Sequence, residues 1–98
     1  MGARIPIDKE AIAAFCRIWH VTDLALFGSV LRDDFGPESD VDVLVTFEAD
    51  YSPGWFIVTM EDELGTMFGR KVDLVIKKAL YHRIRDRILA EAEVQFAA

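Results

Sequence analysis

Residues 28–47 read GSVLRDDFGPESDVDVLVTF, and within them Asp40 and Asp42 stand two apart at the head of a β-branched run. Strand side chains alternate between faces, so both carboxylates point the same way from Cα atoms about 6.5–7 Å apart. Two carboxylates held side by side repel each other unless one is protonated or a divalent cation lies between them. The pair therefore predicts a cation site at the start of a strand. A capped turn that binds no metal is the alternative.

Twelve residues before Asp40, Gly28 and Ser29 have the composition of a turn that presents backbone N–H groups to phosphate oxygens. Glycine lets the chain approach a phosphate closely, and serine adds a hydroxyl at a helix N-terminus, where the helix dipole favours anions. Arg32, one turn further on, carries a charge suited to a phosphate oxygen. Its alternative partners are the neighbouring acids Asp33, Asp34 and Glu38. A carboxylate pair beside a phosphate cradle indicates metal-dependent nucleotidyl transfer.

A third carboxylate, Asp73, interrupts the apolar run VDLVI at residues 72–76. A charge in a half-buried strand is costly unless it is paired or bound to a metal. If this strand lies beside the strand at 40–47, Asp73 faces the same site as Asp40 and Asp42. Three carboxylates suit two Mg²⁺ ions about 3.5–4 Å apart, which act on both sides of an in-line displacement, with Asp73 as proton acceptor. An edge residue that faces water is the alternative for Asp73.

Hydrophobic spacing and turn residues predict seven elements in the order α-β-α-β-α-β-α. The strongest strand prediction is 41–47, where valines alternate with polar residues. In chain order we expect a helix from the N-cap Asp8 to about Trp19, a strand at 24–27, a short helix at 29–34, a strand at 41–47, a helix from Ser52-Pro53 to Gly69, a strand at 71–76 and a helix from Leu80 with apolar residues every fourth position to Phe96. The predicted architecture is one layer of helices on a small mixed sheet, in the α/β (α+β) class.

The length and composition predict a single domain, residues 1–98, with 52% apolar residues for its core. No stretch approaches ~18 uncharged apolar residues, and the first residues do not form a secretory signal. We therefore expect neither membrane insertion nor secretion. The single cysteine, Cys16, fits a reducing cytoplasm and lies in an apolar helical stripe, which predicts a buried thiol.

The net charge of −6 is unevenly distributed. Residues 33–69 hold ten Asp or Glu and no Lys or Arg, whereas residues 70–87 hold seven of the eleven basic residues. Because the acidic half repels a polyanionic backbone, an extended nucleic-acid footprint is not expected. The basic residues suit one triphosphate or an acidic patch on a partner protein, and a solvated face is the alternative.

The pattern G-S-x-x-R-x-D followed by S-D-x-D-x-x-V, at residues 28–45, resembles the signature of the polymerase-β-like nucleotidyltransferase superfamily. The later KVDLV at 71–75 and the chain length resemble its smallest members, the minimal nucleotidyltransferase (MNT) proteins. The resemblance covers nearly the whole chain and implies the core fold of that superfamily. By this match the phosphate-binding turn corresponds to Gly28 and Ser29, the metal-binding pair to Asp40 and Asp42, and the third carboxylate to Asp73.

The resemblance also implies a role. MNT proteins are commonly encoded beside a HEPN-domain protein, and the pair resembles a toxin–antitoxin system in which the HEPN protein is an RNase toxin. There the MNT partner neutralises the toxin by transferring AMP from ATP to a toxin tyrosine. By this likeness we expect a cytoplasmic, Mg²⁺-dependent antitoxin within a homo- or hetero-oligomer. Candidate docking surfaces are the C-terminal helix with Arg83, Arg85 and Arg87 and the tail at 94–98, with ordinary packing beside a solvated rim as the alternative.

Two other functions stay open at this point. The chain could be an antitoxin that neutralises its partner by binding alone, with a vestigial site. It could also transfer a nucleotide to a small molecule such as an aminoglycoside, which normally requires an additional helical domain. The intact carboxylates favour the active antitoxin, because a purely steric inhibitor has no need to retain side chains that repel each other. Nucleotide preference and the number of AMP units transferred do not follow from the sequence.

Overall fold

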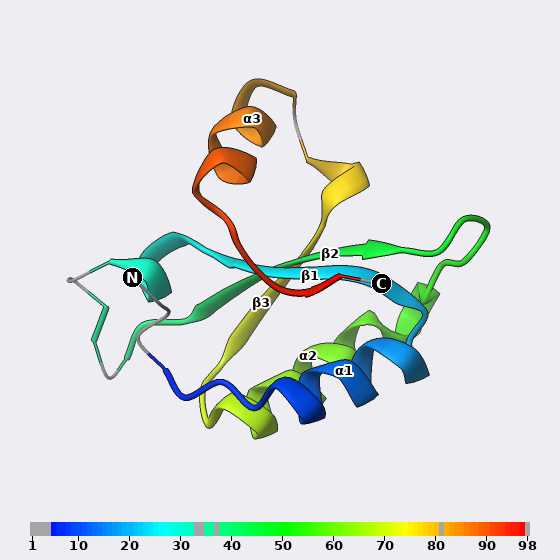
Figure 1. The fold of residues 1–98 in the computed structure, drawn as a ribbon, viewed down its shortest axis with the longest axis horizontal. Coiled ribbons are helices and arrows are strands. Elements are labelled where there is room, and N and C mark those ends of the chain that lie inside the picture. The colour runs from blue at the N-terminus through cyan, green and yellow to red at the C-terminus, as the bar shows by residue number, and fades with distance from the viewer. Residues whose placement is uncertain (1–4, 33–34, 37, 81, 98) are drawn as a thin grey trace.

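Four strands form one mixed sheet in the order β3-β2-β1-β4 in a computed structural model that describes residues 5–32, 35–36, 38–80 and 82–97 (Figure 1). The strands are β1 (Val21–Phe27), β2 (Val41–Phe47), β3 (Val72–Ile76) and β4 (Glu93–Ala97). The helices are α1 (Lys9–Ile18), α2 (Ile57–Phe68) and α3 (His82–Glu91), with short 3₁₀ turns η1 (Gly28–Leu31), η2 (Gly54–Phe56) and η3 (Lys77–Ala79). Since β1 is antiparallel to β2 and β4, and β2 is parallel to β3, the predicted mixed sheet is confirmed.

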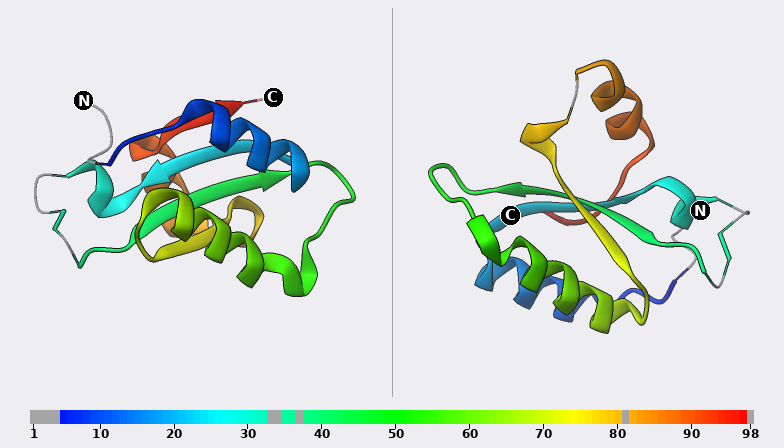
Figure 2. Two further views of the ribbon diagram at one scale, coloured as in Figure 1. Left: turned by 90° about the horizontal axis from the view of Figure 1, so that it is seen from below. Right: turned by 180° about the vertical axis from the view of Figure 1, so that it is seen from behind.

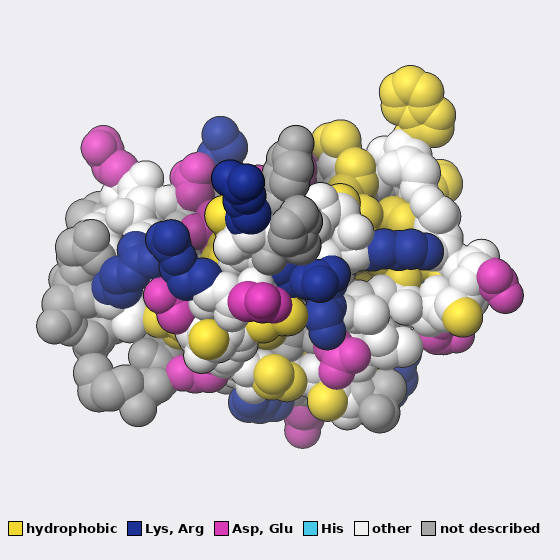
Figure 3. All heavy atoms as spheres, turned by 90° about the horizontal axis from the view of Figure 1, so that it is seen from above, with side chains coloured by type: hydrophobic (Ala, Val, Ile, Leu, Met, Phe, Trp, Pro, Cys, Tyr) yellow, Lys and Arg dark blue, Asp and Glu magenta, His cyan; other side chains and the backbone are white. Residues whose placement is uncertain are grey.

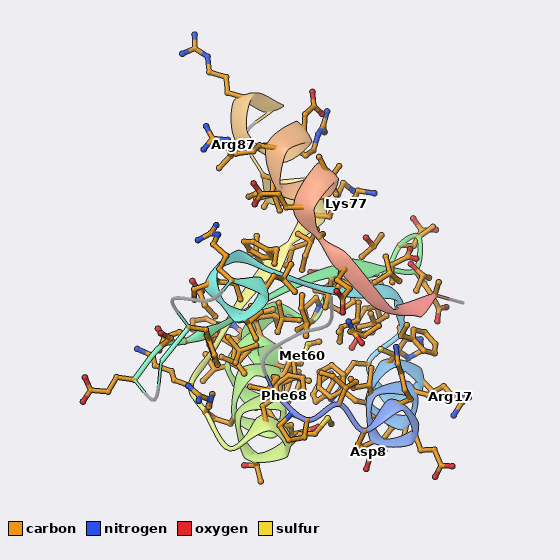
Figure 4. The ribbon with its side chains drawn as sticks, turned by 60° about the vertical axis from the view of Figure 1, so that its left-hand side comes forward. Asp8, Arg17, Met60, Phe68, Lys77 and Arg87 are labelled. Atoms are coloured by element: carbon orange, nitrogen blue, oxygen red, sulfur yellow. The ribbon has the colours of Figure 1, made fainter. Side chains whose placement is uncertain are left out.

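Helices α1 and α2 lie side by side on one face of the sheet (Figure 2). The core fills the space between them and the sheet, where Met60 and Phe68 of α2 are buried (Figure 4). Alternate residues of β2, from Val41 to Val45, are fully buried on this face. The intervening side chain of Asp42 therefore points to the opposite face of the sheet.

Local signals in the sequence mark the ends of several elements. Asp8 caps α1 as predicted, because its carboxylate accepts a 3.1 Å hydrogen bond from the backbone N–H of Ala11. β1 begins at Val21, earlier than the predicted 24–27, because Val21 pairs with Phe47 at the end of β2. The short helix predicted at 29–34 is the turn η1, with positions 33 and 34 outside the described residues. Among the described residues, no helix has the length and hydropathy needed to cross a membrane.

The prediction of a final helix that continues to Phe96 is wrong. Helix α3 ends at Glu91, and the residues after Ala92 form β4, in which Phe96 pairs with Leu24 of β1. The fourfold apolar spacing is helical, but pairing with the edge of β1 satisfies the backbone groups that β1 would otherwise leave open. The tail at 94–97, considered above as a docking surface, is therefore part of the sheet.

The prediction of a single helical layer is also wrong, because α3 lies on the face opposite α1 and α2 (Figure 1). In Figure 4, Arg87 of α3 stands on the far side of the sheet from Asp8 and Arg17. Most described side chains of α3 are exposed, including 45% of Ile84. α3 therefore adds little to the core and is placed to form a wall over the open face of the sheet.

Leu64→Ala is expected to lower the free energy of unfolding by about 2–5 kcal/mol, because Leu64 is fully buried beneath the sheet and its truncation leaves a cavity. Val58→Ala on the same helix is the control, since Val58 is 59% exposed and its truncation should change stability by less than about 0.5 kcal/mol. Urea unfolding followed by circular dichroism measures both. Equal losses in the two variants would contradict this account of the core.

Candidate active site

The parallel pairing of β2 and β3 puts Asp42 directly beside Asp73, because these two residues are register partners. Both side chains point away from α1 and α2, since the adjacent residues Val41 and Val72 are buried on that side. Burial raises the pKa of Asp42, and the negative charges of Asp73 and then Asp40 raise it further. Asp73 and Asp40 therefore both lie close enough to Asp42 for their negative charges to repel its own.

Gly28 lies against the carboxyl group of Asp42 and adopts a left-handed φ of +78°. A Cβ atom at this position would fall 3.2 Å from Cγ of Asp42 and closer still to one of its oxygens. Glycine is therefore needed here both for the backbone conformation and for the close approach. Ser29 follows at the start of η1, so the predicted phosphate-binding turn adjoins the carboxylate pair.

A cleft of about 390 Å³ opens over this turn. Its floor and one wall come from β1, η1 and β2, through Phe27, Gly28, Ser29, Arg32 and Asp42. The opposite wall is α3, through Ile84, Arg87, Ile88 and Glu91. Figure 3 views the molecule from this side, where Lys and Arg side chains lie among Asp and Glu side chains. The cleft combines cationic, carboxylate and apolar groups, which suits a nucleoside polyphosphate.

Arg32 lies at this cleft with two acidic neighbours. Its charge opposes the burial and the repulsion that raise the pKa of Asp42. Its guanidinium also lies 3.8 Å from the carboxylate of Glu91, and both side chains are about half exposed. Glu91 is a partner that the sequence did not suggest, and Asp33 and Asp34, two of the acids considered there, lie outside the described residues. Such an exposed pair contributes little to stability, so it can yield to a phosphate.

The wall formed by α3 is the part of the site that the sequence did not reveal. Arg87 belongs to the basic segment 70–87, which indicated triphosphate binding in general terms without singling out a residue. The helical spacing of Ile84 and Ile88 predicted only an apolar stripe. Their position at the cleft depends on α3 crossing the open face of the sheet before β4 returns to β1, which no local pattern encodes.

The fit of the carboxylates to a metal rests on their chemistry. Within the described parts of the chain, no three His, Cys, Asp or Glu side chains are grouped so that they could hold a metal ion. Asp40, Asp42 and Asp73 therefore do not form a complete coordination shell in this conformation. Their oxygens are nevertheless the donors that Mg²⁺ prefers, and Mg²⁺ usually keeps several waters. A divalent cation would also relieve the repulsion that acts on Asp42.

In metal-free buffer at pH 7, Asp42→Asn is expected to raise the melting temperature. The folded-state pKa of Asp42 lies above its ordinary value, so the folded chain holds this proton more tightly than the unfolded chain. Stability from this group therefore falls as the pH rises through the interval between the two values, and asparagine removes that loss. Thermal melts at pH 7 and at a pH below both values measure the effect, which should disappear at the lower pH.

Mg²⁺ provides the second half of this test. It should raise the melting temperature of the wild-type chain, because a ligand that binds only the folded state stabilises it, and it should have less effect on Asp42→Asn. Asp62→Asn, at an exposed position of α2, is the control for the loss of one negative charge. A lower melting temperature for Asp42→Asn than for wild type at pH 7 would contradict the prediction.

Other candidate groups lie away from this chemistry. Cys16 is fully buried, and burial raises the pKa of its thiol to about 12, so the predicted buried thiol is confirmed. Trp55 and Phe56 are 95% and 60% exposed, so neither side chain belongs to the core. A larger cavity of about 580 Å³ lies at the far end of β2, beside Tyr51, and none of the predicted site residues line it.

Comparisons with known proteins identify relatives of this chain in sequence and in fold. The sequence profile of the nucleotidyltransferase domain matches residues 8–94. The protein adenylyltransferase MntA of Thermococcus cleftensis is 39% identical over 71 residues, which cover 72% of this chain and 71% of the relative.

Solved structures share the fold. A chain from a toxin–antitoxin crystal structure with AMP-PNP aligns with a TM-score of 0.76 at 18% identity, covering 94% of this chain and 75% of that one. A chain from the structure of a tri-AMPylated Shewanella oneidensis HEPN toxin in complex with MNT antitoxin aligns with a TM-score of 0.68 at 17% identity, covering 92% and 70%. At these identities the likeness concerns the arrangement of helices and strands.

Proposed function

The chain belongs to the nucleotidyltransferase domain family, and on that premise we propose that it transfers AMP from ATP to a tyrosine of a HEPN-domain toxin, as the antitoxin of the pair. One observation carries the proposal. Asp42 is the register partner of Asp73 and lies against the left-handed Gly28, and it lines a cleft together with Arg32 and Arg87. The names of the relatives, a protein adenylyltransferase and toxin–antitoxin complexes with AMP-PNP or an AMPylated toxin, support the same reaction.

The carboxylates would hold the metal. Asp40, which directly precedes β2, Asp42 on that strand and Asp73 on the adjacent strand would supply oxygen ligands to Mg²⁺. When bound there, Mg²⁺ would polarise the phosphate oxygens of ATP and lower the pKa of the acceptor hydroxyl. Asp73 is the more exposed member of the register pair, and we assign it the proton released by that hydroxyl.

The remaining residues of the cleft bind and orient the nucleotide. The turn at Gly28 and Ser29 offers backbone N–H groups and a hydroxyl to the terminal phosphates. Arg32 exchanges Glu91 for a phosphate oxygen, and Arg87 approaches the triphosphate from the opposite wall. This pair of cations stabilises the charge that collects on the departing diphosphate.

The acceptor is supplied by the partner. A tyrosine hydroxyl has a pKa near 10 and is a weak nucleophile at neutral pH, so it requires a base and a cation to react. Asp73 and the proposed Mg²⁺ site provide both on the open face of the sheet. A tyrosine presented across the cleft by a docked protein would then attack the α-phosphate of ATP.

The proposal is tested by incubating the chain with Mg²⁺, its HEPN-domain partner and ATP labelled at either the α- or the γ-phosphate. AMP transfer puts the α-label, and not the γ-label, on the partner, and peptide mass spectrometry should place it on tyrosine. Transfer of the γ-label alone would indicate phosphorylation and refute the proposal. Neutralisation of the partner without any label would instead show that the chain acts by binding.

A further inference from the structure

Arg70 lies outside the cleft, yet it is tied to the chain just before the carboxylate pair. One guanidinium nitrogen, Nη1, donates hydrogen bonds to the carbonyl oxygens of Gly36 at 2.6 Å and Ser39 at 3.3 Å. The guanidinium carbon also lies 4.2 Å from the ring centroid of Phe35. A single side chain from the turn between α2 and β3 therefore makes three contacts with the loop that precedes β2.

That loop has a hydrogen-bonded local fold of its own. The backbone N–H of Ser39 donates to the carbonyl of Gly36 at 3.1 Å, and the hydroxyl of Ser39 accepts from the N–H of Gly36 at 3.0 Å. The two carbonyls that Arg70 binds thus belong to one closed turn. Arg70 is partly buried, so its loss would remove charge-assisted bonds from carbonyls with limited access to water.

Both residues that flank Asp40 are held by the turn between α2 and β3. Ser39, immediately before it, is bound by Arg70, and Val41, immediately after it, donates its N–H to the carbonyl of Lys71 at 2.9 Å. Arg70 and Lys71 are consecutive and lead directly into β3, which carries Asp73. The turn between α2 and β3 therefore sets where Asp40 stands relative to Asp73.

We propose that Arg70 is a positioning residue, which holds the loop before β2 and thereby fixes the backbone of Asp40 beside the Asp42 and Asp73 pair. The consequence for metal binding rests on the proposed function, in which these carboxylates hold Mg²⁺. Some residues orient a metal ligand without binding the metal themselves, and their removal commonly changes the metal affinity. Arg70 would orient Asp40 through the main chain of the loop, without itself touching the reacting groups.

The contacts made by residue 70 require an arginine, and the turn that carries it must pack closely against α2. The planar guanidinium binds carbonyls through its edge while its face stacks on Phe35, an arrangement that the compact ammonium group of lysine does not reproduce. Gly65 of α2 leaves room for this turn, because a Cβ atom added at Gly65 would lie only 3.0 Å from the carbonyl oxygen of Arg70. The same glycine accepts the backbone N–H of Arg70 at 3.1 Å.

The test compares Arg70→Met and Arg70→Lys with Lys71→Met, an adjacent exposed position that removes the same charge and leaves the loop contacts intact. NMR amide exchange is measured first, in the full chain without metal. Both Arg70 variants should exchange the amide hydrogen of Ser39 about tenfold faster than wild type, with α1 unchanged. Mn²⁺ binding, followed by electron paramagnetic resonance, should weaken about tenfold in Arg70→Met and remain near wild type in Lys71→Met.

Each outcome has a separate meaning. Unchanged exchange at Ser39 in Arg70→Met would overturn the proposal, whether or not the chain transfers AMP. Faster exchange with unaltered Mn²⁺ affinity would overturn it as well, since the loop would then not position a ligand. Wild-type behaviour of Arg70→Lys would overturn the requirement for the guanidinium shape. A wild-type chain that binds no Mn²⁺ would refute the proposed metal site, and amide exchange alone would then decide whether Arg70 fixes Asp40.

Discussion

Asp42→Asn is expected to reduce the rate of AMP transfer by about 10³-fold or more while the chain remains folded. Asp42 is the most buried of the three carboxylates, and the other two raise its pKa, so it lies at the centre of the negative charge. Stabilisation of transition-state charge by a bound metal amounts to several kcal/mol, and about 4 kcal/mol corresponds to three powers of ten in rate. Single-turnover transfer of α-labelled AMP to the toxin measures the loss.

The comparison with Asp62→Asn separates lost chemistry from lost charge. Both variants reduce the net negative charge by one, but Asp62 is exposed on α2, on the face of the sheet opposite the cleft. Asp62→Asn should therefore transfer AMP at nearly the wild-type rate. Transfer by Asp42→Asn within tenfold of wild type would refute the assignment of Asp42 to the metal site.

The two effects of Asp42→Asn have one origin. Without metal, the ionised carboxylate costs stability because it is partly buried beside two other negative charges. A cation bound at the proposed site would be attracted by the same negative charges, so the repulsion would become binding energy. A chain that becomes more stable and less active on the same substitution would therefore show that stability is given up locally for function.

Alternation along β2 made much of the site predictable from the sequence. The strand occupies residues 41–47 as expected, because valines at every second position can be buried only if Asp42 and its neighbours on that face point away. The close approach of Asp42 and Asp73 also followed, once the two apolar runs were taken as adjacent strands. Local periodicity sufficed because both residues are carried by regular strands.

Local patterns in the sequence did not predict the contacts between segments that lie far apart along the chain. The residues from Leu80 to Phe96 have helical spacing, yet the edge of β1 pairs with the last of them as β4. Gln95 in β4 is buried, and its side-chain oxygen accepts a 3.0 Å hydrogen bond from Lys9, 86 positions earlier. The contacts of Arg70 with Gly36 and Ser39 also span more than thirty positions. Such pairs depend on the completed fold, so spacing along the chain carries no sign of them.

Gly28→Ala is expected to reduce AMP transfer by about 10²-fold, with a loss of about 1–2 kcal/mol in stability. The left-handed φ of Gly28 accounts for the loss of stability, because an L-residue in this conformation is strained by about that amount. The loss of rate has a separate cause. The added Cβ would overlap the carboxyl group of Asp42 and displace either this proposed metal ligand or the proposed phosphate-binding turn, and a displacement of about 1 Å can lower a rate 10²-fold.

Gly54→Ala distinguishes these two causes. Gly54 also has a left-handed φ, of +55°, but a Cβ added there would meet no atom within 4 Å. It should therefore lose a similar amount of stability in urea unfolding and keep its rate of AMP transfer. If Gly28→Ala and Gly54→Ala lost equal activity, backbone strain alone would explain both variants. A tenfold or greater difference in rate at equal stability would instead assign the loss to the place of Gly28 at the cleft and against Asp42, since Gly54 has neither.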